Sequence, residues 1–182
     1  MTWIHTFTGR RFTPLAPKAN DVSLDDIAHA LSMKCRYNGH CSTFYSVAEH
    51  SVLVASKATP RLALRALMHD AHEAYLVDLA APLKGADEFA GVCDVEKRLD
   101  KAIAERFNLP YPIKDNEIDR LDKRILLDEG QALMHRGTEG WNVTGPALGV
   151  KIQGWPPHIA KAQFKQAFIR YSQWHYELNG AA

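Results

Sequence analysis

Cysteine is scarce in this sequence, and its three thiols form no obvious framework. Cys35, Cys41 and Cys93 are odd in number and include no C-x-x-C pair. Small secreted domains are usually stapled by an even set of cysteines. We therefore expect reduced thiols in a cytosolic compartment and assign these cysteines no special role.

Long apolar runs and a charge excess are also lacking. The first twelve residues, MTWIHTFTGRRF, do not resemble a signal peptide, and no run approaches the roughly 18 apolar residues of a membrane span. The net charge is +1, which favours neither nucleic acid nor an anionic membrane as a partner. We expect a soluble cytoplasmic protein that holds any acidic substrate through a local cluster of cations.

The sequence does have the composition of one globular domain over residues 1–182. Of its residues, 46% are hydrophobic and 24% charged, enough for a sizeable core. Apolar residues recur at three-to-four spacing, and no long strand is evident, so we predict an all-α helical bundle. The predicted helices span about 24–33, 45–57, 60–75, 87–107, 115–134 and 157–178, with an extended lead-in or short hairpin in 1–20 and a long loop at 136–157.

Helix boundaries are indicated by capping and turn residues. Residues 23–26 (SLDD) are typical of a capping box, and Thr59 followed by Pro60 predicts an N-cap and first helical position. Asn38-Gly39 predicts a turn inside 34–46, and Pro82 is expected to close the loop after the third helix.

The segment ALMHDAHEAYLVDL, residues 66–79, places ionisable side chains in apolar surroundings. They are His69, Asp70, His72, Glu73 and Asp78. An unpaired carboxylate or imidazole costs several kcal/mol to bury, so such groups are usually paired or bound to a metal.

A metal site here needs ligands from several helices. His69 and Asp70 are adjacent, about 100° apart on a helix, and can reach one ion only near its edge. His50, within an apolar helix, and Asp122, flanked by Leu121, are candidates to complete it. Two histidines and two aspartates suit Co²⁺, Mn²⁺, Zn²⁺, Fe²⁺ or Ni²⁺ without choosing among them.

Each added ligand has an ordinary alternative. His50 could be a hydrogen-bonded core histidine, and Asp122 a surface residue paired with a basic neighbour. Asp119 and Asp128 on the same predicted helix compete for the role of Asp122. Spacing alone leaves these alternatives open.

The wider pattern resembles a known superfamily. The order RY…H…HDxxE…D is similar to the HD-domain phosphohydrolases, which are named for adjacent His-Asp ligands. Three segments look like the small bacterial 5′-deoxynucleotidases, prophage members included, and a phage branch that hydrolyses dATP to nucleoside and triphosphate is also similar. The likeness covers about residues 3–135, with core motifs in about 23–135, and is carried by CRYNGHCSTFYSVAEHSVL, LMHDAHEAYLVDLAAPLK and AIAERFNLP.

The resemblance implies a role for each matching residue. His50, His69, Asp70 and Asp122 match the metal ligands, and Glu73 and Asp78 match the acidic pair that positions water and manages protons. Arg36 and Tyr37 match a basic-aromatic pair beside phosphate and sugar, where the family often carries Arg-Trp. Lys84 matches a basic position near the phosphate. The expected cofactor is one divalent ion, foremost Co²⁺, Mn²⁺ or Zn²⁺, with Mg²⁺, Ni²⁺ and Fe²⁺ as alternatives.

Three positions are less defined. His40, in the turn, could donate to phosphate or serve only the turn. His72 departs from the small residue usual in the family, and we expect an exposed helix residue, with a substrate contact as the alternative. Trp141 and Trp155 in the long loop could form a lid or an oligomer contact, or simply pack.

The resemblance implies a metal-dependent phosphohydrolase acting on (deoxy)nucleoside 5′-monophosphates, and we expect a homodimer or larger homo-oligomer. A dNTP triphosphohydrolase uses the same metal site and is the first alternative. A non-catalytic nucleotide-binding regulator is the second, although no expected ligand is missing.

Overall fold

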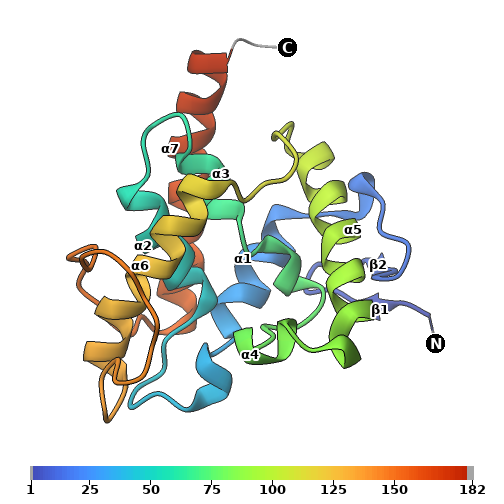
Figure 1. Cartoon of the computed structure of the whole chain (residues 1–182). Helices are drawn as coiled ribbons and strands as arrows, with labels where there is room; N and C mark the ends of the chain where they lie inside the picture. Colours follow the sequence, from blue (N-terminus) through green and yellow to red (C-terminus); the bar gives the residue numbers. More distant parts are fainter. Residues whose placement is uncertain (1, 180–182) are drawn as a thin grey trace.

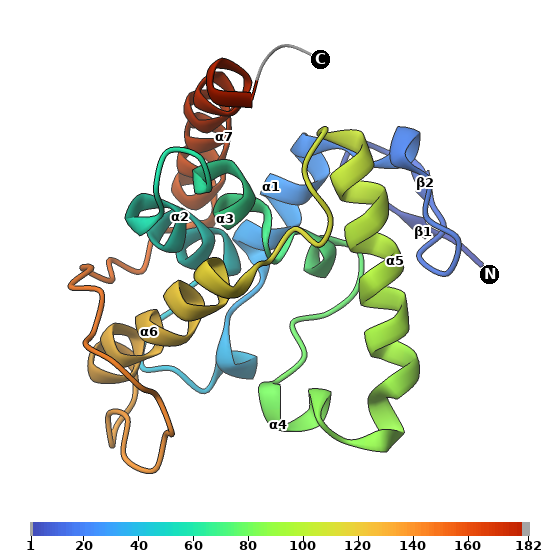
Figure 2. The same ribbon diagram turned by 45° about the horizontal axis from the view of Figure 1, so that its top comes forward.

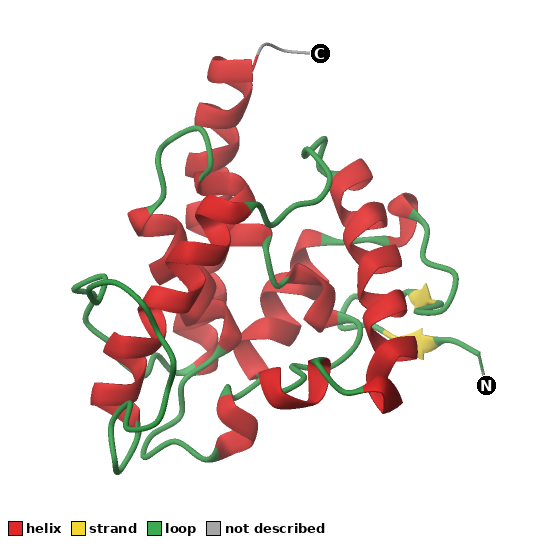
Figure 3. Ribbon diagram, viewed as in Figure 1, coloured by secondary structure: helices red, strands yellow, loops and turns green. Residues whose placement is uncertain are grey.

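Residues 2–179, which the computed structural model describes, form an all-α fold with one small hairpin (Figure 1, Figure 3). The α-helices are α1 (Leu24–Met33), α2 (Val47–Lys57), α3 (Ala63–Met68), α4 (Ala81–Lys84), α5 (Ala90–Arg106), α6 (Asn116–Leu133) and α7 (Pro157–Asn179). Short 3-10 turns cover Ala19–Asp21, Tyr37–Gly39, Ala71–Ala74 and Asp87–Phe89. The strands β1 (Ile4–His5) and β2 (Arg11–Phe12) pair antiparallel, with Ile4 opposite Phe12.

Most predicted helices are confirmed, and their caps explain where they begin. The Ser46 hydroxyl accepts the Glu49 amide at the start of α2, and the Asp115 carboxylate accepts two amides at the start of α6. Ser23 does precede α1, but its side chain makes no capping hydrogen bond. The Asp26 carboxylate of the expected capping box instead accepts the backbone amide and hydroxyl of Thr8 in the hairpin.

The predicted third helix, 60–75, is wrong at both ends. Residues 60–62 form a turn in which the Thr59 carbonyl accepts two amides, and α3 begins only at Ala63. The helix then stops at Met68, because Asp70 adopts φ −108° and ψ 15° and a 3-10 turn follows. In place of one long helix there is a break at the His-Asp pair, and this break positions the site described below.

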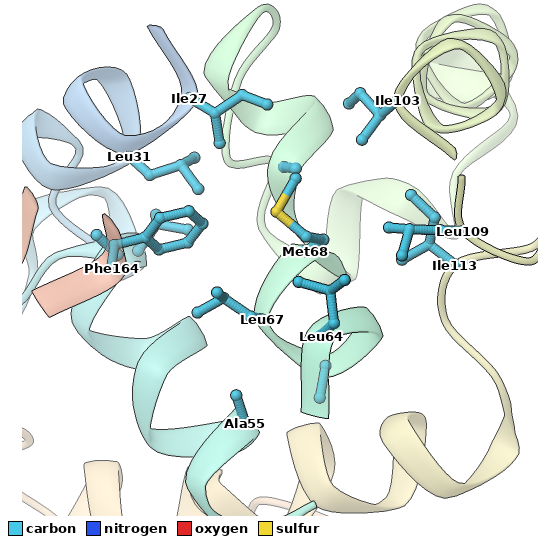
Figure 4. Packing of buried hydrophobic residues seen from close by; sticks show 14 of the residues in the cluster. Ile27, Leu31, Ala55, Leu64, Leu67, Met68, Ile103, Leu109, Ile113 and Phe164 are labelled. Carbon is cyan, nitrogen blue, oxygen red and sulfur yellow. The ribbon is translucent and has the colours of Figure 1, made fainter. Parts of the chain in front are cut away.

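The core lies where α1, α2, α3 and α7 pack against one another. Figure 4 shows side chains from these helices converging on Met68 of α3, among them Ile27 and Phe164. All three are fully buried. Each such side chain contributes about 1.5–3 kcal/mol of hydrophobic stabilisation, so this packing fixes the backbone of α2 and α3.

The remaining helices flank this core on two sides. In both Figures 1 and 2, α5 lies beside the hairpin, whereas α6 lies with the loop 136–157 on the other side. Since α6 also contacts α2, ionisable residues of α2, the end of α3 and α6 can meet. No helix within residues 2–179 is long and apolar enough to cross a membrane.

Candidate metal centre

Three side chains, from α2, the end of α3 and α6, meet beside the core. His50 of α2 and His69, just after α3, face each other with their Nε2 atoms 3.4 Å apart. Asp122 of α6 places Oδ1 at 3.0 Å from the His50 Nε2 and 3.6 Å from the His69 Nε2. One ligand atom from each residue lies within 4.8 Å of the other two, so the cluster can hold a metal ion.

Asp70 approaches the same two imidazoles from the break after α3. Its Oδ2 lies 3.2 Å from the His69 Nε2 and 3.7 Å from the His50 Nε2. On a regular helix, adjacent residues diverge by about 100°. Because the helix stops at Met68, His69 and Asp70 can face one centre together.

Asp122, and not its two rivals on α6, is the carboxylate in this cluster. Asp119 pairs with Lys123 at 2.6 Å on the exposed face. Asp128 accepts three backbone amides, from Leu148, Gly149 and Val150.

Both histidines are oriented by hydrogen bonds at their other ring nitrogen. His50 Nδ1 lies 2.6 Å from Oε1 of Glu129, and His69 Nδ1 lies 2.8 Å from the carbonyl oxygen of Ala66. A proton on Nδ1 in each case leaves Nε2 free to bind a metal ion. Two oriented imidazole nitrogens and carboxylate oxygens form a donor set that fits a divalent transition-metal ion.

Glu129 is a fully buried carboxylate that connects this cluster to the segment after α1. Besides His50, it accepts the Tyr45 hydroxyl at 2.8 Å, the Arg36 Nη2 at 3.3 Å and the Tyr37 hydroxyl. Burial opposes its ionisation, but the Arg36 charge and the hydrogen bonds from His50 and Tyr37 together outweigh burial and lower the pKa of Glu129 to about 2. Glu129 is therefore an anion that fixes His50, Arg36 and two tyrosines at once.

The electrostatics of the cluster favour positive charge at its centre. Burial alone would lower the pKa of His69, yet the carboxylates of Asp70 and Asp122 raise it to about 10. Conversely, hydrogen bonds from His50 and His69 hold the pKa of Asp122 well below its usual range despite burial. A bound cation would be stabilised by the same carboxylates.

Glu73, in the 3-10 turn after the break, has a different environment. Its side chain is almost fully buried, and its Oε2 has no hydrogen-bond partner. Burial, followed by the negative charges of Asp70 and Asp78, raises the pKa of Glu73 well above its ordinary value. Asp78 is half-buried and acts on Glu73 through its charge. Perturbed carboxyl groups of this kind are typical of proton-transfer sites.

Arg36 and Tyr37 lie beside the cluster. The Arg36 Nη1 is 3.8 Å from Oδ2 of Asp70, and its buried Nε has no hydrogen-bond partner. Tyr37 and Asn38 have φ values of +57° and +52°, a conformation that costs about 1–2 kcal/mol for residues other than glycine. The Tyr37 hydrogen bond to Glu129 holds this strained turn in place.

The other basic and histidine candidates lie farther out. Lys84 of α4 pairs with Glu96 of α5 at 3.1 Å. His40 is exposed and borders a separate surface hollow of about 340 Å³, together with residues 132–135. The prediction that His72 is exposed is wrong: it is buried, with Nδ1 3.0 Å from Asp100 and Nε2 3.7 Å from Glu96. The contacts with these two carboxylates of α5 offset the free-energy cost of burying His72.

The long loop 136–157 is fastened to the site by two carboxylates. Glu49, fully buried and adjacent to His50, accepts the amides of Gln153, Gly154 and Trp155 at 2.6–3.1 Å. Asp128, adjacent to Glu129, holds residues 148–150 in the same way.

The two loop tryptophans occupy different surroundings. The Trp141 ring lies nearly parallel to that of Tyr37, with centroids 5.9 Å apart, whereas Trp155 packs against the core. Trp141 is thus next to the candidate site, whereas Trp155 simply packs, which was the alternative to a lid or an oligomer contact.

Comparison with known proteins gives a family but no activity. No family model matches the chain. The uncharacterized protein YfdR of Escherichia coli strain K12 is 38% identical over 133 residues, which is 73% of this chain and 73% of YfdR. The chain belongs to the YfdR family. An uncharacterized protein of Rhodobacter capsulatus, RCAP_rcc00048, is 40% identical over 117 residues, 59% of each chain.

Several residues at this YfdR-family site were not singled out from sequence. Glu129 lies seven residues after Asp122 on α6, and two helical turns place both on one face, so this spacing could have revealed it. Glu49, beside His50, gives no comparable signal, because its partners lie more than 100 residues away. Lys114, whose Nζ donates to Oδ2 of Asp122, precedes α6 and looks like an ordinary loop lysine in the sequence.

Proposed function

We propose that this protein is a metal-dependent phosphohydrolase of the HD-domain type that removes the 5′-phosphate from (deoxy)nucleoside monophosphates. The observation that carries the proposal is the buried meeting of His50, His69 and Asp122, with Asp70 against the same imidazoles. The arginine that contacts Asp70 supplies a phosphate-binding group next to this cluster.

The proposed metal ligands are His50, His69, Asp70 and Asp122, and Co²⁺, Mn²⁺ and Zn²⁺ are the ions that we expect first. A divalent ion bound there would polarise water and neutralise charge on the phosphoryl oxygens. The orientation of both imidazoles by Glu129 and Ala66 supports this assignment.

The chain's own groups supply the remaining chemistry. In the proposed reaction water attacks phosphorus, the bond from phosphorus to the 5′-oxygen breaks, and nucleoside and phosphate are released. Glu73, whose pKa is raised by burial and by neighbouring carboxylates, takes the proton from water and returns one to the 5′-oxygen. Asp78 assists through its charge, and Arg36 holds the phosphate through two N–H donors.

The first alternative is release of triphosphate from a dNTP. A triphosphate needs more cations than a monophosphate, and Lys34 is a candidate to supply one. Its Nζ, however, is committed to the backbone carbonyl oxygens of Glu73 and Leu76. This commitment favours the monophosphate as substrate.

The test is a product-resolved assay of protein loaded with Co²⁺ or Mn²⁺. All dNMPs and dNTPs are offered to wild type, to Asp70→Ala and to Asp94→Ala, a control at an exposed carboxylate of α5. We expect orthophosphate from dNMPs, reduced at least about 100-fold in Asp70→Ala but not in the control. Triphosphate from a dNTP would support the alternative instead, and no metal-dependent product would favour a regulatory nucleotide-binding protein. Size-exclusion chromatography of the same sample tests the predicted homo-oligomer.

A further inference from the structure

Lys114 is a cation beside the candidate metal cluster and lies outside the sequence motifs that indicate the site. Its Nζ donates to Oδ2 of Asp122, while Oδ1 of the same carboxylate faces His50 and His69. The Lys114 side chain is 33% exposed. The Lys114 side chain therefore reaches the cluster while about a third of it stays exposed to solvent.

The backbone that carries Lys114 is firmly held. The Arg65 guanidinium of α3 donates to the carbonyl oxygens of Pro112 at 2.9 Å and Ile113 at 3.1 Å, and to the Asp115 carboxylate at 2.8 Å. The Ile113 side chain is fully buried. Lys114 can thus move its flexible side chain from a fixed backbone position.

Arg36 and Lys84 also interact with carboxylates near the cluster. The Arg36 Nη1 lies 3.8 Å from Asp70. Burial opposes the charge of Lys84 and Lys114, but nearby carboxylates, foremost Glu96 for Lys84 and Asp122 for Lys114, raise the pKa of both. Arg36 and Lys114 therefore contact two carboxylates of the cluster, Asp70 and Asp122, from two separate segments: the segment after α1 and the connection before α6.

Both cations have donors that are not used within the protein. The buried Nε of Arg36 has no hydrogen-bond partner, and the Lys114 ammonium has three N–H donors, one of which is used by Asp122. A phosphate group beside the metal cluster would offer acceptors to both.

We propose that Lys114, together with Arg36, binds the substrate's phosphate group at the metal cluster. In the complex the Lys114 ammonium donates to a phosphoryl oxygen in addition to Asp122 or in its place. The inference rests on the proposed function and adds to it a phosphate-binding residue outside the family motifs.

The test measures the binding of inorganic phosphate to Mn²⁺-loaded protein by isothermal titration calorimetry. Lys114→Met keeps much of the side-chain volume and removes the charge. Lys123→Met is the matched control, because Lys123 is 64% exposed and pairs with Asp119. We expect Lys114→Met to weaken phosphate binding at least about tenfold, and the control to stay within about twofold of wild type.

Mn²⁺ affinity, measured without phosphate, separates phosphate binding from the orientation of Asp122. We expect Lys114→Met to bind Mn²⁺ as well as wild type or better, since a positive charge near the ion is removed. Weaker Mn²⁺ binding with unchanged phosphate affinity at saturating Mn²⁺ would overturn the proposal, because Lys114 would then only position Asp122. Equal phosphate affinity in all three proteins, or no phosphate binding by wild type, would also overturn it.

Failure of the proposed function gives a different result. If phosphate binds as expected but wild type releases no product from any nucleotide, the phosphate-binding role of Lys114 is supported and the hydrolase assignment is refuted. If nucleotides are hydrolysed and Lys114→Met leaves both KM and phosphate affinity unchanged, the hydrolase stands and the role of Lys114 is refuted.

Discussion

Replacing Glu129 by glutamine tests whether one buried anion holds the site together. The carboxylate accepts hydrogen bonds from Arg36, Tyr37, Tyr45 and His50, and it is fully buried. Glutamine has nearly the same shape but no charge, and one of its two terminal atoms is a donor facing other donors. The Arg36 guanidinium would lose its buried counter-ion.

The size of the effect follows from the pKa of Glu129, which is about 2 in the folded protein against an ordinary value of 4.5. This difference corresponds to about 3 kcal/mol, at about 1.4 kcal/mol for each factor of ten. Loss of one partner in a buried ion pair typically costs about 3–5 kcal/mol. We expect Glu129→Gln to lower the free energy of unfolding by about 3 kcal/mol at pH 7, and the melting temperature by about 6–12 °C.

The pH dependence gives the mutation a signature. Because the pKa of Glu129 is lower in the folded state, its stabilising effect is complete above pH 4.5 and is lost as the pH falls toward 2. Urea unfolding of metal-free protein at several pH values should show the gap between wild type and Glu129→Gln closing over that range. Glu139→Gln, at an exposed position, is the control. A loss below about 1 kcal/mol at pH 7, or a gap that does not change with pH, would refute this account of Glu129.

Two further substitutions test the proton-transfer group and the anchored loop. Glu73→Gln should reduce phosphate release by about 10²–10⁴-fold. Its Mn²⁺ affinity, measured by equilibrium dialysis, should stay near that of wild type, because Glu73 lies outside the metal-binding cluster. A parallel loss of Mn²⁺ binding would contradict the proton-transfer role of Glu73. Gly154→Ala should destabilise the protein by about 1–2 kcal/mol and speed proteolysis of the loop, since Gly154 has φ +65° and an added Cβ would lie 3.0 Å from the Phe44 carbonyl oxygen. Gly85→Ala is the control, because there is open space around Gly85. Equal rates of loop cleavage in both variants would refute this account of Gly154.

The sequence predicted the parts of this molecule that depend on local patterns. Apolar patterns and capping residues located α1, α2, α5, α6 and α7 to within a few residues. Ionisable residues in apolar surroundings indicated His50 and His69, whereas Asp122 was chosen over Asp119 and Asp128 only through the family resemblance. These signals are readable because burial of a charge without a partner is costly.

The errors arise where distant parts of the chain decide the outcome. The helix pattern of 60–75 continues through His69, yet the structure breaks there, where His69 and Asp70 meet side chains of α2 and α6. His72 was expected on the surface because nothing near it in sequence reveals Asp100, its partner 28 residues away. The role of Glu49 is equally hard to predict, because the loop amides that it accepts lie more than 100 residues away in the sequence.

The loop 136–157 shows that lack of helix or strand need not mean lack of order. Six of its amides, at 148–150 and 153–155, donate to only two carboxylates, Asp128 and Glu49. In hydrogen exchange these amides would be slow, like those of a helix, although the segment is rich in glycine. Their protection would depend on side chains encoded elsewhere, so loss of the Glu49 carboxylate alone would release three amides together. The order of this loop thus depends on carboxylates of α2 and α6.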